Sequence, residues 1–326
     1  MAATEDRGGG RAAANEQLQV FVLDDCEAFR DRLCAALGVG AAPFEYRPFE
    51  GGEFKLRPLV EVRRRDVFIV HRLTGAGDQT VNDRLVQLLF FAATLRDQGA
   101  AQCTVVIPYL PYARKDQRTK VRDPLSLRYL AQLVEAVGID RIMVMDVHNL
   151  AGFENAFRCN TVPLEARRVF AEALRERLGG RDLAVVSPDA GGVKRANAMR
   201  TTLQEMTGRN PSAVFLEKYR SEGVVSGDAL VGDVSGRVAV IVDDLIAGGT
   251  TMRRAVRAVM QHGAVGAIAV ATHGVFADGA SALLEEPGLE ALLVTNSVPS
   301  AQLQSGHPRL HVVPVEPVLA EVIASL

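Results

Sequence analysis

The stretch Arg237–Ala258, RVAVIVDDLIAGGTTMRRAVRA, decides the fold of this chain. It begins with an uninterrupted apolar run, Val238–Val242, which is typical of a strand buried on both faces of a parallel sheet. Asp243 and Asp244 follow, where we expect the strand to end, and then a loop of small residues, Gly248–Thr251. A helical spacing of apolar residues comes next. The stretch therefore predicts a strand, a turn and a helix, the repeating unit of an α/β fold.

The turn of this unit has the composition of an anion-binding site. Free backbone N–H groups and the positive end of a helix dipole favour phosphate, and the hydroxyls of Thr250 and Thr251 add donors. The carboxylates of Asp243 and Asp244 would accept hydrogen bonds from sugar hydroxyls or hold a phosphate-bound cation. A sugar-phosphate pocket and a plain capped turn explain these residues equally well, because glycine and threonine suit both.

The rest of the chain repeats the alternation of strand and helix. Strands are expected at residues 19–25, 66–73, 103–109, 141–148, 183–188, 212–219, 267–272, 291–295 and from 311, with a hairpin at 44–58. Helices are expected at residues 26–38, 82–98, 125–137, 164–178 and 193–207. This order predicts an α/β fold of two units, each a mainly parallel sheet flanked by helices. We place the units at residues 18–160 and 161–326, after a disordered tail at residues 1–17, and expect the last helix to pack back on the first unit.

The composition is that of an ordinary globular protein. The 326 residues are 48% hydrophobic and 23% charged, with a net charge of −2. This charge gives no electrostatic footprint for nucleic acid, and no apolar run approaches the roughly 20 residues that span a bilayer. The four cysteines show no metal-ligand spacing, so free thiols in a reducing compartment are expected. We therefore expect a cytoplasmic protein without a nucleic-acid or membrane partner.

Polar clusters follow several of the predicted strands, at the edge where parallel sheets bind ligands. Gly51, Gly52 and Glu53 form a glycine turn beside a carboxylate. The segment Tyr112–Lys120, YARKDQRTK, concentrates cations at the end of a strand and would suit a polyphosphate such as a nucleotide tail. A surface hairpin and a solvated charge run are the alternatives for these two stretches.

Three more clusters have the same placement. Asp146 and His148 are two residues apart, so strand alternation would place both on one side, as a metal or a metal-bound phosphate needs. The stretch Ser187–Arg195, SPDAGGVKR, puts two cations in the first turns of a helix, where an anion between them would offset the unfavourable dipole. Lys218 and Arg220 precede a stretch expected to close over a substrate as a loop. So many phosphate-friendly sites indicate a reaction between a sugar phosphate and a nucleoside polyphosphate.

Seven motifs carry a resemblance to a known family. They are FEGGE, IPYLPYARKD, MDVH, VVSPDAGGVKRA, EKYR, GDVSGRVAVIVDDL and THGVF. In this order they resemble the ribose-phosphate diphosphokinase (phosphoribosyl diphosphate synthase) family, over nearly the whole chain from about Gln17. The resemblance implies transfer of the β,γ-diphosphoryl group of ATP to the C1 hydroxyl of ribose 5-phosphate, with release of AMP. It also implies two phosphoribosyltransferase-like domains and a homo-oligomer built from dimers, up to a hexamer.

The resemblance implies roles for individual residues. Asp243 and Asp244 would hold the ribose hydroxyls, and the 5-phosphate would lie on the loop of Ala247, Gly248, Gly249, Thr250 and Thr251. Lys218 and Arg220 would be catalytic, stabilising charge on the transferring group. His148 and Asp189 would be associated with Mg²⁺. The ATP contacts would come from Gly51, Gly52, Glu53, Arg114 and Lys115.

The chain departs from the family pattern at four places, which suggests a divergent branch. Gly51 replaces the aspartate of F-x-D-G-E, Lys115 stands in the middle of R-Q-D, and Tyr219 in the middle of K-R-R. The phosphate loop, usually D-T-x-G-T, begins with Ala247 and Gly248. A regulatory relative without activity is the main alternative to an active synthase. A transferase that consumes phosphoribosyl diphosphate is a further one, although it leaves YARKD and FEGGE without a purpose.

Overall fold

The chain forms two compact units, each with its own sheet. The structure, a computed structural model, describes residues 18–75, 79–221, 224–300 and 305–326. The N-terminal unit runs to Leu164 and takes in Glu316–Leu326 again, while the C-terminal unit is Glu165–Val315. The tail expected at residues 1–17 lies outside the described residues. The prediction of an α/β fold with two mainly parallel sheets is confirmed.

The sheet of the N-terminal unit has five strands in the order β1-β4-β5-β6-β7, and every neighbouring pair is parallel. The strands are β1 Leu18–Val22, β4 Asp66–Val70, β5 Gln102–Ile107, β6 Arg141–Met145 and β7 Asn160–Leu164. The expected hairpin forms a small antiparallel sheet of its own from β2 (Phe44–Pro48) and β3 (Phe54–Pro58).

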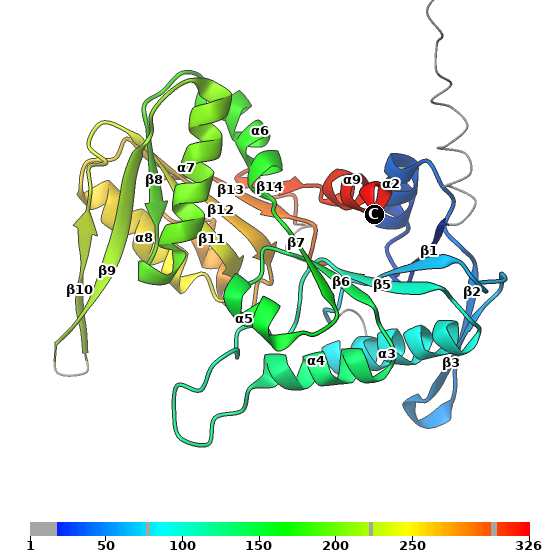
Figure 1. Cartoon of the computed structure of the whole chain (residues 1–326). Helices are drawn as coiled ribbons and strands as arrows, with labels where there is room; N and C mark the ends of the chain where they lie inside the picture. The colour runs from blue at the N-terminus through cyan, green and yellow to red at the C-terminus, as the bar shows by residue number, and fades with distance from the viewer. Residues whose placement is uncertain (1–17, 76–78, 222–223, 301–304) are drawn as a thin grey trace, which may run out of the picture. The chain divides into compact units, whose positions relative to one another are not determined.

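Helices cover both faces of this sheet (Figure 1). The apolar stripes of α3 (Val81–Asp97) and α4 (Ser126–Ala136) pack with inward residues of the strands, such as Val67 and Val105, in one core. On another side, α2 (Glu27–Leu37) packs against α9 (Glu316–Ser325), the last helix of the chain. Arg32 Nη2 lies 2.7 Å from Oε1 of Glu316, whose side chain is only 1% exposed. The final helix is therefore fixed into the N-terminal unit.

The C-terminal unit is built on a seven-stranded sheet in the order β10-β9-β8-β11-β12-β13-β14. Its strands are β8 Leu183–Ser187, β9 Ser212–Ser221, β10 Val224–Val231, β11 Val238–Ile246, β12 Gly266–Gly274, β13 Leu289–Thr295 and β14 Leu310–Val313. Only the edge pair of β9 and β10 is antiparallel among the pairings of this sheet in the described residues. The strand predicted from the apolar run at Val238 is thus a central one, next to β8 and β12.

The helices of the C-terminal unit divide between the two faces of its sheet. The apolar face of α8 (Thr250–Gln261) packs on Ala239, Ile241 and Ala269. The other helices are α6 (Arg167–Leu178) and α7 (Val193–Thr207), which pack against each other (Figure 1). Successive residues of the central strands point to opposite faces of the sheet, and those on both faces are buried, as the continuous apolar pattern predicts.

Three local predictions are wrong. The strand expected to end before Asp243 continues through Ile246, because β12 pairs with it as far as Gly274. The stretch after Tyr219 continues β9 to Ser221 and returns as β10, which gives a hairpin where a loop was expected. The strand at residues 141–148 ends at Met145, and α5 (Leu150–Ala156) and β7 follow it without having been predicted.

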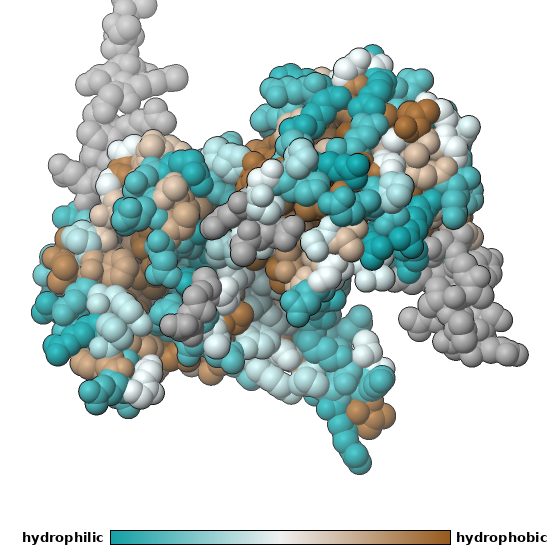
Figure 2. Space-filling view, turned by 180° about the vertical axis from the view of Figure 1, so that it is seen from behind, coloured by the Kyte–Doolittle hydropathy of each residue, from teal (hydrophilic) through white to brown (hydrophobic). Residues whose placement is uncertain are grey.

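The surface is dominated by hydrophilic side chains in the face that Figure 2 shows, with hydrophobic ones in scattered patches. Some large hydrophobic side chains are exposed on helices of the N-terminal unit, namely Val86, Phe90, Tyr129 and Leu133. Within the described part of the chain, none of the helices is both long and apolar enough to cross a membrane.

Candidate functional site

The acid pair of β11 lies at the carboxyl edge of the seven-stranded sheet. The ladder between β11 and β8 ends at Ile241, whereas the ladder with β12 continues past Asp243. The side chain of Asp243 is 20% exposed and that of Asp244 only 6%. The two carboxylates therefore belong to a strand rather than a loop. At this point β11 is paired with β12 and no longer with β8.

The two acids disfavour each other's charge. Burial, followed by the adjacent Asp244, raises the pKa of Asp243 from 3.8 to about 7. The backbone N–H of Asp244 donates to Asp243 Oδ1 at 2.8 Å, which offsets part of this effect. A buried carboxylate pair of this kind gains from a nearby cation or from hydrogen-bond donors such as sugar hydroxyls.

Arg195 supplies one such cation from α7. Its Nη1 lies 3.4 Å from Asp244 Oδ1 and 3.6 Å from Asp243 Oδ1. The sequence indicated a second phosphate site at the cations of this helix, and it did not identify the acid pair as a partner of Arg195. Neighbouring Lys194 is exposed. Because the pairing joins residues about fifty positions apart, no local spacing in the sequence could have found it.

The loop after β11 opens onto the start of α8. Gly249 is the residue before the helix and has φ +74°, a left-handed conformation that favours glycine. A Cβ on Gly249 would lie 3.4 Å from Leu283 Cβ, whereas one on Gly248 would meet little more than Asp278 O at 4.0 Å. Among the described residues, no side chain caps the first turn of α8. Its N–H groups are thus suited to an anion.

Asp189 begins the turn between β8 and α7. Its Oδ1 accepts a hydrogen bond from the N–H of Gly192 at 3.1 Å, and its backbone carbonyl accepts one from Ser187 Oγ at 2.6 Å. A Cβ on Gly192 would lie 2.7 Å from Ser187 Oγ, so a larger residue there would displace the Ser187 hydroxyl from its bond to the Asp189 carbonyl. The turn places Asp189 at the same edge of the sheet as the acid pair, one strand away.

Lys218 and Arg220 lie on β9, near the tip of the hairpin. Lys218 pairs in register with Asp228 of β10, and Arg220 with Val225. A β-bulge lies between Val225 and Gly227. Residues two apart on a strand share one face, so positions 218 and 220 belong to the same face of β9. The side chains of residues 218–228 lie outside what the structure describes.

In the N-terminal unit, the glycine turn lies at the tip of the small hairpin. Gly51 and Gly52 have φ of +80° and +88°, and a Cβ on either would meet open space. The N–H of Phe49 donates to the carbonyl of Glu53 at 2.7 Å and closes the turn. The aspartate that the family pattern has at Gly51 is therefore missing from an exposed turn that leaves room for a side chain.

The cationic segment is organised by an acid that the sequence did not single out. Asp123 Oδ2 accepts hydrogen bonds from the Thr119 and Lys120 N–H groups at 3.0 and 2.9 Å, from Thr119 Oγ1, and from Lys115 Nζ. The Lys115 ammonium, with these donors, holds the pKa of Asp123 well below its usual range. Arg114 is exposed, whereas Lys115 is half-buried and engaged with Asp123. Asp123 thus folds the segment into a loop, while Arg114, Arg118 and Lys120 stay exposed.

His148 and Asp146 follow β6 rather than belonging to it. Asp146 has φ +40°, and its N–H donates to the carbonyl of Leu164 on β7 at 2.9 Å. His148 is exposed, just before α5. Strand alternation therefore does not relate these two side chains, contrary to the prediction from the sequence. Asn149, next in the chain, donates to Asp116 Oδ2 at 2.6 Å and so ties this turn to the cationic segment.

Across the described residues, no group of three or more histidine, cysteine, aspartate or glutamate side chains could hold a metal ion. His148 and Asp189 lie in different units, and each belongs to a turn at the end of a parallel strand. Mg²⁺ commonly takes one or two carboxylates and completes its shell with substrate phosphates and water. A site of that kind does not require a cluster of three side chains.

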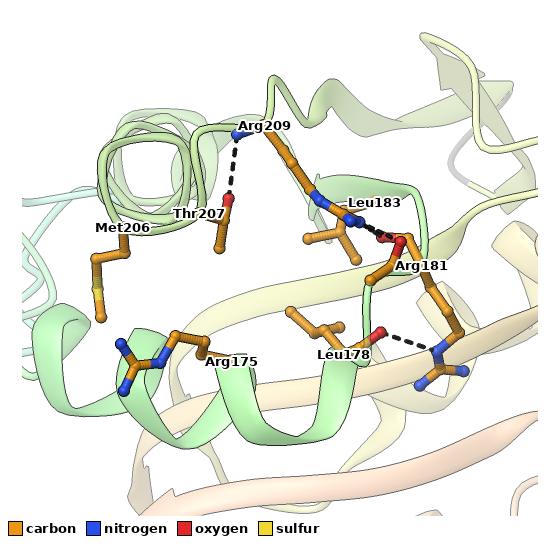
Figure 3. Close-up of a pocket in the computed structure, with 8 residues that line it drawn as sticks. Arg175, Leu178, Arg181, Leu183, Met206, Thr207 and Arg209 are labelled. Carbon is orange, nitrogen blue, oxygen red and sulfur yellow. Dashed lines mark hydrogen bonds between the residues drawn. The ribbon is translucent and has the colours of Figure 1, made fainter.

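A separate cavity of about 300 Å³ lies at the amino edge of the C-terminal sheet (Figure 3). Two of its three arginines have structural partners: Arg181 pairs with both oxygens of Glu290 at 2.9 Å, and Arg209 donates to the Arg181 carbonyl at 3.0 Å. These bonds secure the ends of α6 and α7. The cavity lies at the opposite edge of the sheet from the acid pair.

Comparison with known proteins gives concordant matches. The family model for the N-terminal domain of ribose phosphate pyrophosphokinase matches residues 18–138, and that of the phosphoribosyl synthetase-associated domain matches residues 224–326. A ribose-phosphate pyrophosphokinase of Parasynechococcus marenigrum is 34% identical over 308 residues, covering 94% of this chain and 90% of the relative. Ribose-phosphate pyrophosphokinase A of Dictyostelium discoideum is 34% identical over 277 residues, 84% of each chain.

A solved structure agrees with these matches. The crystal structure of phosphoribosylpyrophosphate synthetase from Mycobacterium smegmatis superposes with a TM-score of 0.84 at 30% identity. The alignment covers 95% of this chain and 98% of the other.

Proposed function

Because the chain belongs to the ribose-phosphate pyrophosphokinase family, we propose that its two units divide the reaction of that family between them. The enzyme transfers the β,γ-diphosphoryl group of ATP to the C1 hydroxyl of ribose 5-phosphate and releases AMP. Both family domains match, and the relatives align over most of their length. This favours an active enzyme over a regulatory relative or a transferase that consumes the product.

The acceptor sugar belongs to the C-terminal unit in this proposal. Asp243 and Asp244 accept hydrogen bonds from the ribose hydroxyls, and the 5-phosphate binds the loop of residues 247–251 at the start of α8. The observation that carries the proposal is the juxtaposition of a carboxylate pair held by Arg195 with an uncapped helix start. The acids match neutral donors, whereas the N–H groups and the threonine hydroxyls match an anion.

The nucleotide belongs to the N-terminal unit. ATP contacts Gly51, Gly52 and Glu53 of the hairpin turn, and Arg114 and Lys115 of the cationic segment. The loop that Asp123 folds gives Lys115 a fixed position, which suits a point charge near a polyphosphate. Lys218 and Arg220 of β9 stabilise charge on the transferring group, since phosphoryl transfer depends mainly on positioning and charge neutralisation.

The same proposal includes Mg²⁺, with His148 and Asp189 associated with it. Asp189 offers a half-buried carboxylate, the kind of oxygen donor that Mg²⁺ prefers, and the exposed imidazole of His148 also follows a strand end. The raised pKa of Asp243 also indicates that the acid pair would gain from a neighbouring cation. When bound, Mg²⁺ would neutralise phosphate charge. Asp243, Asp244 and the loop of residues 247–251 would orient the sugar for the transfer.

We further propose a cytoplasmic homo-oligomer built from dimers and extending up to hexamers, as the family resemblance implies. The exposed side chains of Val86, Phe90, Tyr129 and Leu133 give the N-terminal unit apolar surface that a second copy would cover. Light scattering on the purified chain would give the mass in solution. A monomer at micromolar concentration would contradict the oligomer.

The experiment for the site assignment compares two substrates. Purified protein with ATP, Mg²⁺ and ribose 5-phosphate should form AMP and phosphoribosyl diphosphate in equal amounts. Asp243→Asn should raise the KM for ribose 5-phosphate by about tenfold while the KM for ATP changes little. Asp233→Asn, an exposed acid on the loop before β11, is the control. If Asp243→Asn altered only the KM for ATP, the acceptor site would be elsewhere.

A further inference from the structure

The strand β12 supports the phosphate loop from behind. It pairs with β11 beyond the acid pair, and the last two register pairs are Leu245 with His273 and Ile246 with Gly274. The chain then donates three backbone hydrogen bonds to the end of β11 and the start of the loop. Those of Val275 and Phe276 go to the Ile246 carbonyl at 3.0 Å, and that of Ala277 goes to the Ala247 carbonyl at 3.1 Å.

Residues 280–283, which follow β12, pack against the loop at Gly249. Leu283 Cβ and the Ala280 carbonyl would lie 3.4 and 3.6 Å from a Cβ on Gly249. A Cβ on Gly274 would lie 2.6 Å from the Phe276 ring, so any larger residue there would have to displace that ring. The backbone of the phosphate loop therefore rests on residues 274–283, and its position depends on where β12 ends.

A buried polar network fixes the end of β12. His273 Nδ1 lies 2.8 Å from Ser297 Oγ, and the Thr295 hydroxyl reaches the Thr272 carbonyl at 2.6 Å. Ser297 Oγ lies 3.2 Å from the same carbonyl. Thr272 and His273 are each 3% exposed, and Thr295 and Ser297 are fully buried. Buried polar groups are kept where every member has a partner, because an unpaired one is costly.

The network coincides with a break in the register between β12 and β13. Ala271 pairs with Val294 and His273 with Thr295, so Thr272 is an extra residue on β12. Its carbonyl has two lone pairs and can accept from both hydroxyls, in which case the Nδ1–H of His273 donates to Ser297. This bulge redirects β12 at the point where its chain turns towards the phosphate loop.

We infer that His273 is a positioning residue for ribose 5-phosphate, acting through its bond to Ser297. The inference rests on the proposed function, in which residues 247–251 bind the 5-phosphate. His273 does not contact substrate in this account. It holds the end of β12 so that the N–H groups of Val275 and Phe276 reach Ile246, the last residue of β11, and that of Ala277 reaches Ala247 of the loop. The motif THGVF would therefore have a structural role in positioning the phosphate loop.

The test separates positioning from general stability. Ser297→Ala removes the partner of the imidazole, and His273→Leu removes the imidazole itself. Both should raise the KM for ribose 5-phosphate by about 3-fold to 20-fold, and change the KM for ATP by less than about 2-fold. His273→Asn keeps a donor near the position of Nδ1, so it should restore much of the affinity. Calorimetric titration of ribose 5-phosphate should show the same order.

Thr202→Val is the matched control, because it also removes a buried hydroxyl, one that donates to Ala198 within α7 at 3.1 Å. It should lower the melting temperature without changing either KM. Gly249→Ala tests the proposed function directly. If it raised the KM for ribose 5-phosphate while Ser297→Ala and His273→Leu did not, the positioning role would be wrong. If Gly249→Ala also left that KM unchanged, the assignment of the loop would fail instead.

Discussion

Arg195 Nη1 lies 3.4 Å from Asp244 Oδ1, and this contact joins the helix after β8 to the acid pair of β11. The Arg195 side chain is 24% exposed and the Asp244 side chain 6%, so the pair is largely shielded from water. Partial burial makes such a contact stronger than a surface ion pair, and breaking it leaves a carboxylate uncompensated.

Replacing Arg195 should therefore shift the pH dependence of substrate binding. Arg195 lowers the pKa of Asp243, which burial and Asp244 raise to about 7. In Arg195→Gln this pKa should rise further, so a higher pH is needed before the carboxylate accepts from the sugar. We expect the acid limb of log(kcat/KM) for ribose 5-phosphate to move upward by about 1 pH unit. Lys194→Gln, an exposed neighbour, should leave the limb in place.

The substrate-free protein should lose stability as pH rises through the titration of Asp243. Its pKa is about 7 in the folded protein, against an ordinary value of 3.8 for an aspartate in the unfolded chain. Between these values the folded protein holds a proton that the unfolded chain releases, so the free energy of unfolding falls as pH rises. Asp243→Asn should thus stabilise the free protein by about 1 to 2 kcal/mol at pH 8 and less near pH 4. If Asp243→Asn shifted the melting temperature equally at both pH values, the raised pKa of Asp243 in the folded protein would be contradicted.

The two glycines of the phosphate loop should differ in their tolerance of alanine. Gly249 has φ +74° and is backed by Leu283, whereas Gly248 faces open space without a positive φ. Gly249→Ala should cost about 1 to 2 kcal/mol of stability from backbone strain and weaken ribose 5-phosphate binding. Gly248→Ala should change stability by less than about 0.5 kcal/mol. Thermal unfolding and the KM values of the pair provide the comparison.

Asp123 should matter for ATP rather than for the sugar. It accepts from Thr119, Lys120 and Lys115 and so folds the cationic segment. In Asp123→Ala the loop loses these bonds and Lys115 loses its fixed position, so the KM for ATP should rise by about tenfold. The KM for ribose 5-phosphate should stay the same. Asp97→Ala, at the exposed end of α3, serves as the control variant.

Lys218 should be needed for the chemical step and not for folding. It lies on the edge hairpin of β9 and β10, where Lys218→Ala leaves the backbone ladder intact. We expect kcat to fall by about 10²- to 10³-fold, the range for losing one charge-stabilising donor. Glu217→Ala changes the neighbouring residue on the opposite face and should retain kcat. A melting temperature lowered by more than about 4 °C would indicate a structural role instead.

Regular features of the chain could be predicted from sequence because they rest on local periodicity. The run at Val238 indicated a central strand, and the glycine turn at Gly51 indicated a hairpin. Features set by distant partners could not be predicted. β11 extends past Asp243 because β12 lies beside it, and β9 extends past Tyr219 because β10 returns along it. The roles of Asp123 and Arg195 could not be predicted for the same reason, since their partners are fixed by tertiary contacts.

The helix α9 has a consequence for how the protein is made. It packs on α2 and belongs to the N-terminal unit, although it follows the whole C-terminal unit in the chain. A ribosome therefore releases this piece of the first unit only after it has made the whole C-terminal unit. The C-terminal unit, as one continuous segment, can fold while translation is still under way. Vectorial synthesis would complete the N-terminal unit after the C-terminal one, and expressing residues 18–164 alone would leave α2 without its partner.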